Sequence, residues 1–229
     1  MSRLKKIKIA LFFSPLFAIT LTIAFFVFNP ADQQIQTNNS MNVIFKGVED
    51  QRIKDSFLKV MKEYESLHDY QITLTQSRIK ASTMQAQPII NLKSIFTGIK
   101  KYEIKLGVYV RDSETITVAD LPEDVLTGWF AHELGHLVDY EAFSNIKMVL
   151  YGLKYLISEK FKIKVEHAAD YIAIENGFRD EIIATKNFIL NHETLEEAYK
   201  EQIRKYYLSV DDVIMCSKKE PLMKPKVGT

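Results

Sequence analysis

The sequence has a single cysteine, Cys216, so it cannot form an internal disulfide. A lone cysteine near the charged C-terminus also has no partner for a zinc finger of the cysteine type. The chain contains no internal repeat, no Walker motif, no glycine-rich dinucleotide fingerprint and no serine nucleophile elbow. These absences exclude repeat architectures and the nucleotide and serine-hydrolase sites that such motifs define.

A strong excess of charge is also missing, since the formal net charge is +1. Arg3, Lys5, Lys6 and Lys8 precede every acidic residue, which leaves 26 basic and 29 acidic residues, a net of −3, from residue 29 onward. A nucleic-acid partner is therefore not expected for that part of the chain. With 47% hydrophobic and 26% charged residues, the composition suits one globular domain that is long enough to bury a core.

Residues 9–28 form an uncharged run of 20 residues, which would measure about 30 Å as a helix. That length matches the hydrocarbon core of a bilayer and predicts a transmembrane anchor instead of a buried core helix. The basic segment 1–8 places the N-terminus in the cytoplasm and the domain on the other side of the membrane. A cleaved secretory signal is the alternative. No small-x-small cleavage pattern follows Phe28, which favours an uncleaved, single-pass anchor.

The rest of the chain divides into a tether, one domain and a tail. Residues 29–46 are predicted to be a flexible tether, because Asn29 to Asn42 is polar, rich in glutamine and asparagine, and contains a proline. The domain is assigned to residues 47–217, and residues 218–229 are expected to be mobile.

Hydrophobic spacing predicts an early sheet and a later helical part. Residues 48–67 have apolar side chains at helical intervals. From Tyr70 the apolar side chains instead alternate with a period of two, as in a strand. The alternation recurs through residues 89–96 and is clearest through residues 104–110. This order predicts an α+β fold, with a small, mainly antiparallel sheet followed by a helical subdomain.

Two segments beside the predicted sheet are candidates for contact with a substrate. Tyr109 to Val118 could offer a free strand edge on which an extended peptide adds by main-chain hydrogen bonds. The polar segment Ser82 to Gln87 is expected to be a surface loop, with a loop above the cleft as the alternative.

Residues 132–136 read HELGH, an H-E-x-x-H pattern inside a helical run. Positions four apart share one face of a helix, so His132 and His136 can offer two imidazole nitrogens to one zinc ion. Glu133 then lies beside the metal, where it can take a proton from a metal-bound water. The alternative is a chance match on a solvated helix.

The residues around this motif favour a buried helix over a chance match. Pro122, with Glu123 and Asp124, suits a helix start, where a fixed φ angle and negative charge are tolerated or favoured. Apolar residues then recur at helical spacing through the motif up to Val138. Buried histidines need partners, and a metal ion is one.

A catalytic zinc ion normally has three protein ligands, so a third must lie elsewhere. The metzincin pattern would require glycine and histidine at the positions that hold Asp139 and Ala142, so that pattern is excluded. Glu166 and Asp170 lie four residues apart in a second helical run. They could point the same way, Glu166 to the metal and Asp170 to a zinc-bound histidine. His167 is the fallback ligand.

The HELGH motif and the later Glu166-x-x-Ala169-Asp170 pattern resemble those of the gluzincin metallopeptidases. The likeness is to the HtpX-like and CAAX-prenyl endopeptidase branch and to the small minigluzincins, and it covers roughly residues 100 to 180. The resemblance implies that His132, His136 and Glu166 bind zinc, that Glu133 is the general base, and that Asp170 supports a ligand. The membrane bundle of the larger members is absent, so their substrate chamber is not implied.

Several other residues could contribute to such a site. Gluzincins often stabilise the oxyanion with a downstream His, Tyr or Arg, and His192, Arg204 and Tyr206 are candidates here, although no motif selects one. The ordinary structural role is the default for these residues and for His68. The apolar run from Ile146 to Phe161 predicts a core helix, with contact to a membrane surface or a partner as the alternative.

The expected protein is a membrane-anchored zinc endopeptidase that binds one Zn²⁺ per chain and acts on a protein or peptide substrate. One alternative is an inactive binding module that keeps a structural zinc site. Another is a zinc amidase that acts on a non-peptide substrate, which would use the same chemistry in a different pocket.

Overall fold

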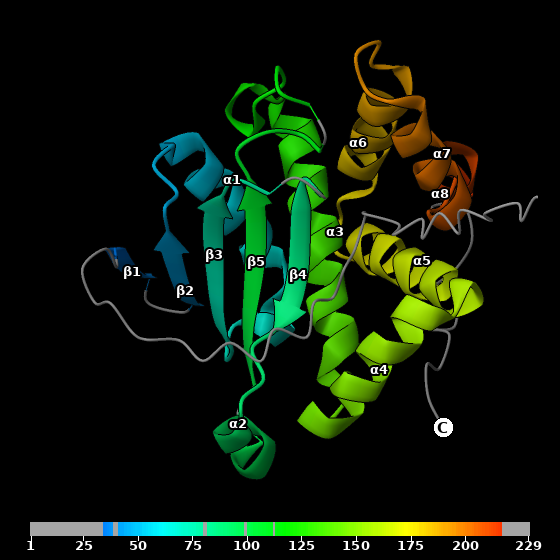
Figure 1. Ribbon diagram of the computed structural model, residues 1–229. Helices are drawn as coiled ribbons and strands as arrows, with labels where there is room; N and C mark the ends of the chain where they lie inside the picture. Colours follow the sequence, from blue (N-terminus) through cyan, green and yellow to red (C-terminus); the bar gives the residue numbers. More distant parts are fainter. Residues whose placement is uncertain (1–33, 39–40, 80–81, 99, 112, 217–229) are drawn as a thin grey trace, which may run out of the picture.

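The computed structural model describes residues 34–38, 41–79, 82–98, 100–111 and 113–216 (Figure 1). The predicted basic segment 1–8, membrane anchor 9–28 and tail 218–229 therefore lie outside the described residues. Within them, no helix combines the length and the hydrophobicity needed to cross a bilayer.

The fold is α+β, as predicted, and is built on a five-stranded sheet in the order β1-β2-β3-β5-β4. The strands are β1 (Gln34–Asn38), β2 (Met41–Lys46), β3 (Gln71–Ser77), β4 (Met84–Pro88) and β5 (Lys101–Gly107). Only the outer pairs β1–β2 and β4–β5 are antiparallel, whereas β2–β3 and β3–β5 are parallel. The prediction of a mainly antiparallel sheet was wrong, because helix α1 (Gln51–Glu63) is a crossover that returns the chain parallel to β2.

The tether predicted for residues 29–46 was wrong for strands β1 and β2. Strand β2 contributes the buried side chains of Val43 and Phe45 to the core and pairs in register with β3. The polar composition of the segment does not prevent pairing, because strand ladders are made by backbone groups.

Two further assignments around the sheet need correction. Residues 89–96 do not form a strand, since Leu92–Thr97 is the short helix α2, which a capping box between Asn91 and Ser94 starts. The segment Ser82 to Gln87 is not a surface loop, because its greater part is the edge strand β4. Tyr109–Val118 is not the free edge, since Tyr109 and Thr117 form only an isolated bridge.

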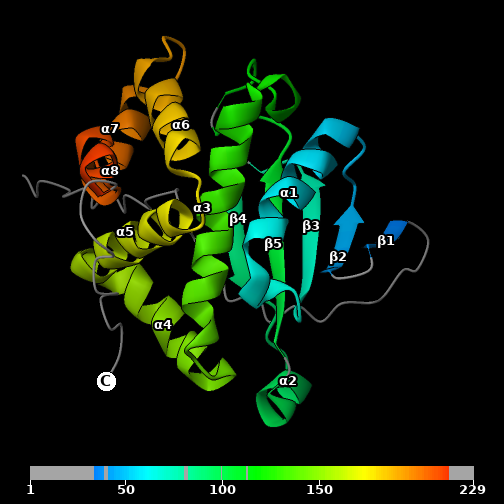
Figure 2. The same cartoon turned by 180° about the vertical axis from the view of Figure 1, so that it is seen from behind.

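Helices α1 and α3 (Glu123–Glu141) pack against one face of the sheet, as the view from behind shows (Figure 2). Aromatic contacts join the sheet to both helices. The ring centroid of Phe57 on α1 lies 6.1 Å from that of Phe45 on β2 and 5.2 Å from that of Phe130 on α3. The remaining helices gather on the far side of α3 (Figure 1). They are α4 (Asn145–Ile157), α5 (Glu159–Glu175), α6 (Arg179–Asn191), α7 (Glu197–Tyr206) and α8 (Val210–Cys216). Short 3-10 helices span Glu65–Leu67 and Val118–Asp120.

Candidate metal centre

The H-E-x-x-H residues lie on α3, in the middle of the protein. The helix starts after Pro122 with Glu123 and Asp124 in its first turn, as the sequence predicts. His132, Glu133 and His136 are all buried. The helix therefore presents these side chains to the interior, and not to solvent.

Helix α5 crosses α3 closely enough to bring a carboxylate to both histidines. The two backbones meet at Gly135, where an added Cβ would lie 2.6 Å from the carbonyl oxygen of Ala169. A glycine is needed at this position because any side chain would meet backbone atoms that cannot rotate away. The close crossing places Glu166, which is fully buried, beside both imidazoles.

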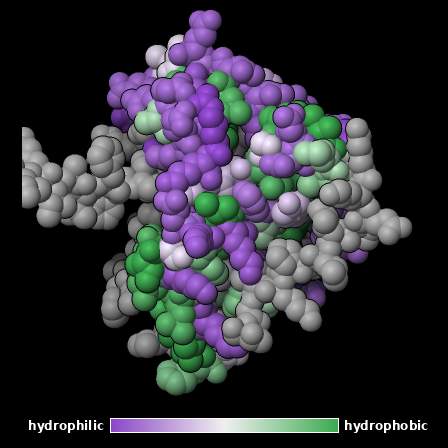
Figure 3. Space-filling model, turned by 90° about the vertical axis from the view of Figure 1, so that its right-hand side faces the viewer, coloured by the Kyte–Doolittle hydropathy of each residue, from purple (hydrophilic) through white to green (hydrophobic). Residues whose placement is uncertain are grey.

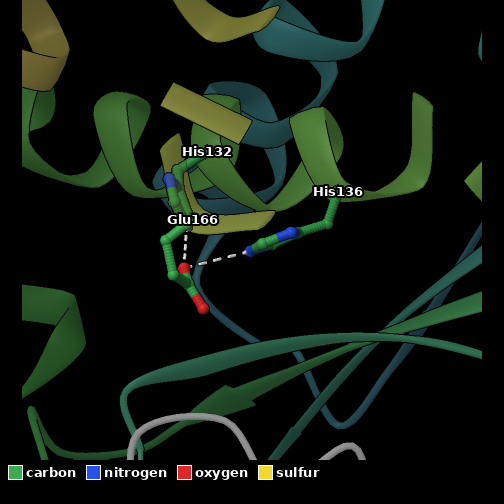
Figure 4. A group of neighbouring side chains, drawn as sticks. All are labelled: His132, His136 and Glu166. Carbon is green, nitrogen blue, oxygen red and sulfur yellow. Dashed lines mark hydrogen bonds and ion pairs between the residues drawn. The ribbon is translucent and has the colours of Figure 1, made fainter. Parts of the chain in front are cut away.

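The nitrogen and oxygen atoms converge as ligands of one metal ion would. Nε2 of His132 lies 3.2 Å from Oε2 of Glu166, and Nε2 of His136 lies 3.5 Å from the same oxygen (Figure 4). All three residues offer a ligand atom within 4.8 Å of one another. Tetrahedral zinc with bonds of about 2.0–2.2 Å separates its ligand atoms by about 3.3 Å. The predicted donor set thus fits one zinc ion.

Asp170 orients the first histidine, in the position that the sequence predicts. The Nδ1–H of His132 donates to Oδ1 of Asp170 at 2.9 Å, which directs Nε2 of the same ring toward Glu166. The other carboxylate oxygen accepts from Nζ of Lys186 at 2.8 Å and from the backbone N–H of Leu208 at 3.1 Å. Burial raises the pKa of Asp170, but the Lys186 and His132 partners more than reverse this and lower the pKa to about 2.

A tyrosine holds Glu166, the third candidate ligand. The Tyr155 hydroxyl, on the inner face of α4, donates to Oε1 of Glu166. The other carboxylate oxygen, Oε2, faces the two histidines. Burial raises the pKa of Glu166, but hydrogen bonds and charge from the two imidazoles lower it below its ordinary value. Burial lowers the pKa of His132, and its bonds to Asp170 and Glu166 reverse this and raise the pKa to about 10. A proton would therefore compete with a metal ion for this ring.

Glu133 lies between the ligands and the edge strand. The backbone N–H of Ala86 on β4 donates to Oε2 of Glu133 at 2.7 Å, which leaves Oε1 without this constraint. Burial is the largest influence on Glu133 and raises its pKa to about 7, although both histidines act in the opposite direction. A carboxyl group with a pKa near neutrality suits a general base.

A pocket opens beside His132 and Glu133, between β4 and the C-terminal helices. Most of its wall is apolar, and Lys186 and Asp170 also line it. The apolar lining residues are Met84, Trp129, Ile182, Ile189, Ile203 and the aromatic rings of Tyr199 and Tyr207. Such a wall suits an apolar side chain held next to His132 and Glu133.

None of the three candidate oxyanion donors lines this pocket. His192 ends α6 against the ring of Phe188, and Arg204 is exposed and bonds to two glutamates. Tyr206 faces the ammonium group of Lys162. The next residue, Tyr207, lines the pocket instead, with its ring centroid 5.3 Å from that of His132.

The two other histidines are not part of the cluster. His68 bonds through Nε2 to the carbonyl oxygen of Met61, at 2.9 Å. His167, the fallback ligand, is not in the group that could hold a metal ion. Of the Glu166–His167 pair, only Glu166 joins the cluster. It is also the one that shares a helix face with Asp170, as the four-residue spacing predicts.

Comparison with protein-family models, with curated proteins and with solved structures finds no match to this chain.

Proposed function

We propose that this protein is a zinc-dependent endopeptidase, anchored in a membrane by residues 9–28 with its domain outside the cytoplasm. The observation that carries the proposal is the convergence of His132, His136 and Glu166 at 3.2 and 3.5 Å, with Glu133 beside them on the wall of an apolar pocket. The resemblance of the two motifs to those of gluzincins supports the same assignment.

His132, His136 and Glu166 would hold the metal. Bound zinc supplies Lewis-acid polarisation of the scissile carbonyl and lowers the pKa of water from 15.7 to roughly 7. Oε1 of Glu133 takes a proton from the attacking water and returns it to the leaving amine. The apolar pocket binds a side chain of the substrate, and the outer edge of β4 is the strand on which an extended peptide would align. Tyr207, whose ring lies beside that of His132 on the pocket wall, is the candidate donor to the developing oxyanion.

The burial of the centre favours one rival function, a structural zinc site in a binding module. Glu133 and His136 are each 1% exposed, and the bond from Ala86 closes β4 over Glu133. Catalysis through Oε1 of Glu133 therefore requires substrate and water to reach this buried group from the pocket. A structural site requires no such access.

Substitution of the general base separates the two functions. Glu133→Gln should retain zinc and lower the cleavage of a peptide library by about 10²–10⁴-fold, because the amide cannot accept the proton. Glu123→Gln is the matched control, since Glu123 is exposed in the first turn of the same helix and should not affect cleavage. Wild-type protein that carries zinc and cleaves no peptide would favour the structural site or a non-peptide substrate.

A further inference from the structure

The outer face of helix α4 is an exposed apolar stripe. Ile146, Leu150, Leu153 and Ile157 follow one another at intervals of four, three and four residues, so they lie along one side of the helix. Their exposed fractions are 60%, 62%, 55% and 76%. The opposite side of α4 carries Tyr151 and Tyr155, which point into the protein. The inner face of α4 therefore packs against the rest of the protein, whereas the outer face makes no contribution to the core.

The neighbouring helix α2 also carries an exposed apolar side chain. The side-chain amide of Asn145 donates to the carbonyl oxygen of Ser94 at 2.6 Å, which joins the start of α4 to α2. On α2, Phe96 is 86% exposed. Figure 3, in which the right-hand side of Figure 1 faces the viewer, shows a hydrophobic area over the lower part of the molecule, where α4 lies. Apolar areas of this kind on soluble proteins mark sites of interaction with a partner or a membrane.

The charges on helix α4 itself are of one sign. Helix α4 contains no acidic residue, whereas Lys147 and Lys154 are exposed along one flank of the stripe. Beyond the end of the helix, Lys160 is exposed next to Glu159, whose carboxylate is paired with Lys205 at 2.6 Å. An apolar face with lysines at its margin is typical of helices that lie in the plane of an anionic membrane surface.

We propose that the outer face of α4, together with Phe96, lies on an anionic lipid bilayer. The inference rests on the membrane anchor of the proposed function and is independent of the zinc chemistry. Only residues 29–33 separate the uncharged run 9–28 from strand β1. Five extended residues span at most about 18 Å, so an anchor in the bilayer would hold the domain against its surface.

Two other groups that could cover the outer face of α4 match its lysines less well. Residues 1–28 contain no acidic side chain, so the run 9–28 folded onto α4 would leave the lysines unmatched. A second copy of the chain, paired through the same face, would bring the lysines of two α4 helices together. Lipid phosphates provide the opposite charge.

The test is fluorescence quenching by lipid. The full chain carries Cys216→Ser and Leu153→Cys, with a fluorophore on the new thiol, and is added to nanodiscs of phosphatidylcholine and phosphatidylglycerol with or without nitroxide-labelled lipid. The matched control is Glu193→Cys, an exposed position in the α6–α7 loop, at the opposite end of the molecule from α4 (Figure 1). Leu150→Cys provides a second position in the stripe should Leu153→Cys fold poorly.

Nitroxide lipid should reduce the emission of the probe at 153 roughly two-fold, as expected at a depth of about 5–10 Å in the headgroup region, and should leave the probe at 193 unchanged. Equal emission at 153 with and without nitroxide would overturn the proposal. If the emission of the probe at 153 were blue-shifted but not quenched, residues 9–28 would be the group that covers the outer face of α4. Energy transfer between labelled copies would assign it to a second chain. The zinc content of the same samples, measured separately, decides the proposed function without affecting this result.

Discussion

Nζ of Lys186 lies 2.8 Å from Oδ2 of Asp170, and both side chains are almost fully buried. The same carboxylate accepts the Nδ1–H of His132 through its other oxygen. A lysine on α6 therefore holds the aspartate on α5 that orients a proposed zinc ligand on α3. The pair keeps Asp170 ionised in a place where burial alone would raise its pKa.

Removal of this lysine should weaken the metal site. Lys186→Met leaves a buried carboxylate without its cation, which typically destabilises a protein by about 3–5 kcal/mol. It should also lower zinc affinity by about 10–100-fold, since the partner that orients His132 is disturbed. Chelator competition would give the affinity, and thermal unfolding the stability.

Two variants make this prediction specific. Lys160→Met removes an exposed lysine and should change neither quantity. Asp170→Asn combined with Lys186→Met removes both charges, and should be more stable than Lys186→Met alone, because no unpaired charge remains. A Lys186→Met protein with unaltered zinc affinity would show that Lys186 only fills space.

The hydroxyl of Tyr155 should matter more for the metal than for the fold. Tyr155→Phe removes the donor to Glu166 and should cost about 1 kcal/mol of stability, but about 10–100-fold in zinc affinity, since the ligand loses its orientation. The matched control is Tyr151→Phe, one turn earlier on α4, whose hydroxyl donates to Asp139 at 2.5 Å and not to a ligand. Equal losses of zinc affinity in both variants would contradict the role of Tyr155.

The crossing of α3 and α5 should not tolerate a methyl group. Gly135→Ala gains about 1 kcal/mol of helix propensity, but overpacking costs about 1–3 kcal/mol or more, and the contact at 2.6 Å is with backbone. The variant should therefore unfold at lower temperature and bind zinc more weakly. Ala169→Gly should not rescue it, because the clash is with the carbonyl oxygen and Cα of residue 169. A Gly135→Ala protein more stable than the wild type would show that the helices move apart at little cost.

Sequence spacing was sufficient to predict those site residues that lie in pairs on the same helix. His132 and His136, like Glu166 and Asp170, are four residues apart, and a helix fixes their common direction. Lys186 was missed, although it lies four residues after Ile182 and three before Ile189, on the buried face of α6. A lysine at such a position requires a buried partner, so this signal was available.

The remaining features depend on packing between distant segments. Nothing in the spacing of α4 separates Tyr155, which contacts Glu166, from Tyr151, which contacts Asp139. The apolar run from Val43 to Phe45 could have identified β2, and a helix between two strands could have indicated parallel pairing. The place of β4 against Glu133 could not be predicted, because it depends on the order of strands in the sheet.

The zinc content of the purified full chain tests the central claim most directly. Elemental analysis should find near one zinc per chain, lost or much reduced in Glu166→Ala, because this residue is the proposed third ligand. His167→Ala is the control: it removes an imidazole one residue away, outside the cluster, and should retain the metal. Folded wild-type protein that takes up no zinc on reconstitution, or a Glu166→Ala variant that retains it fully, would contradict the assignment of this centre.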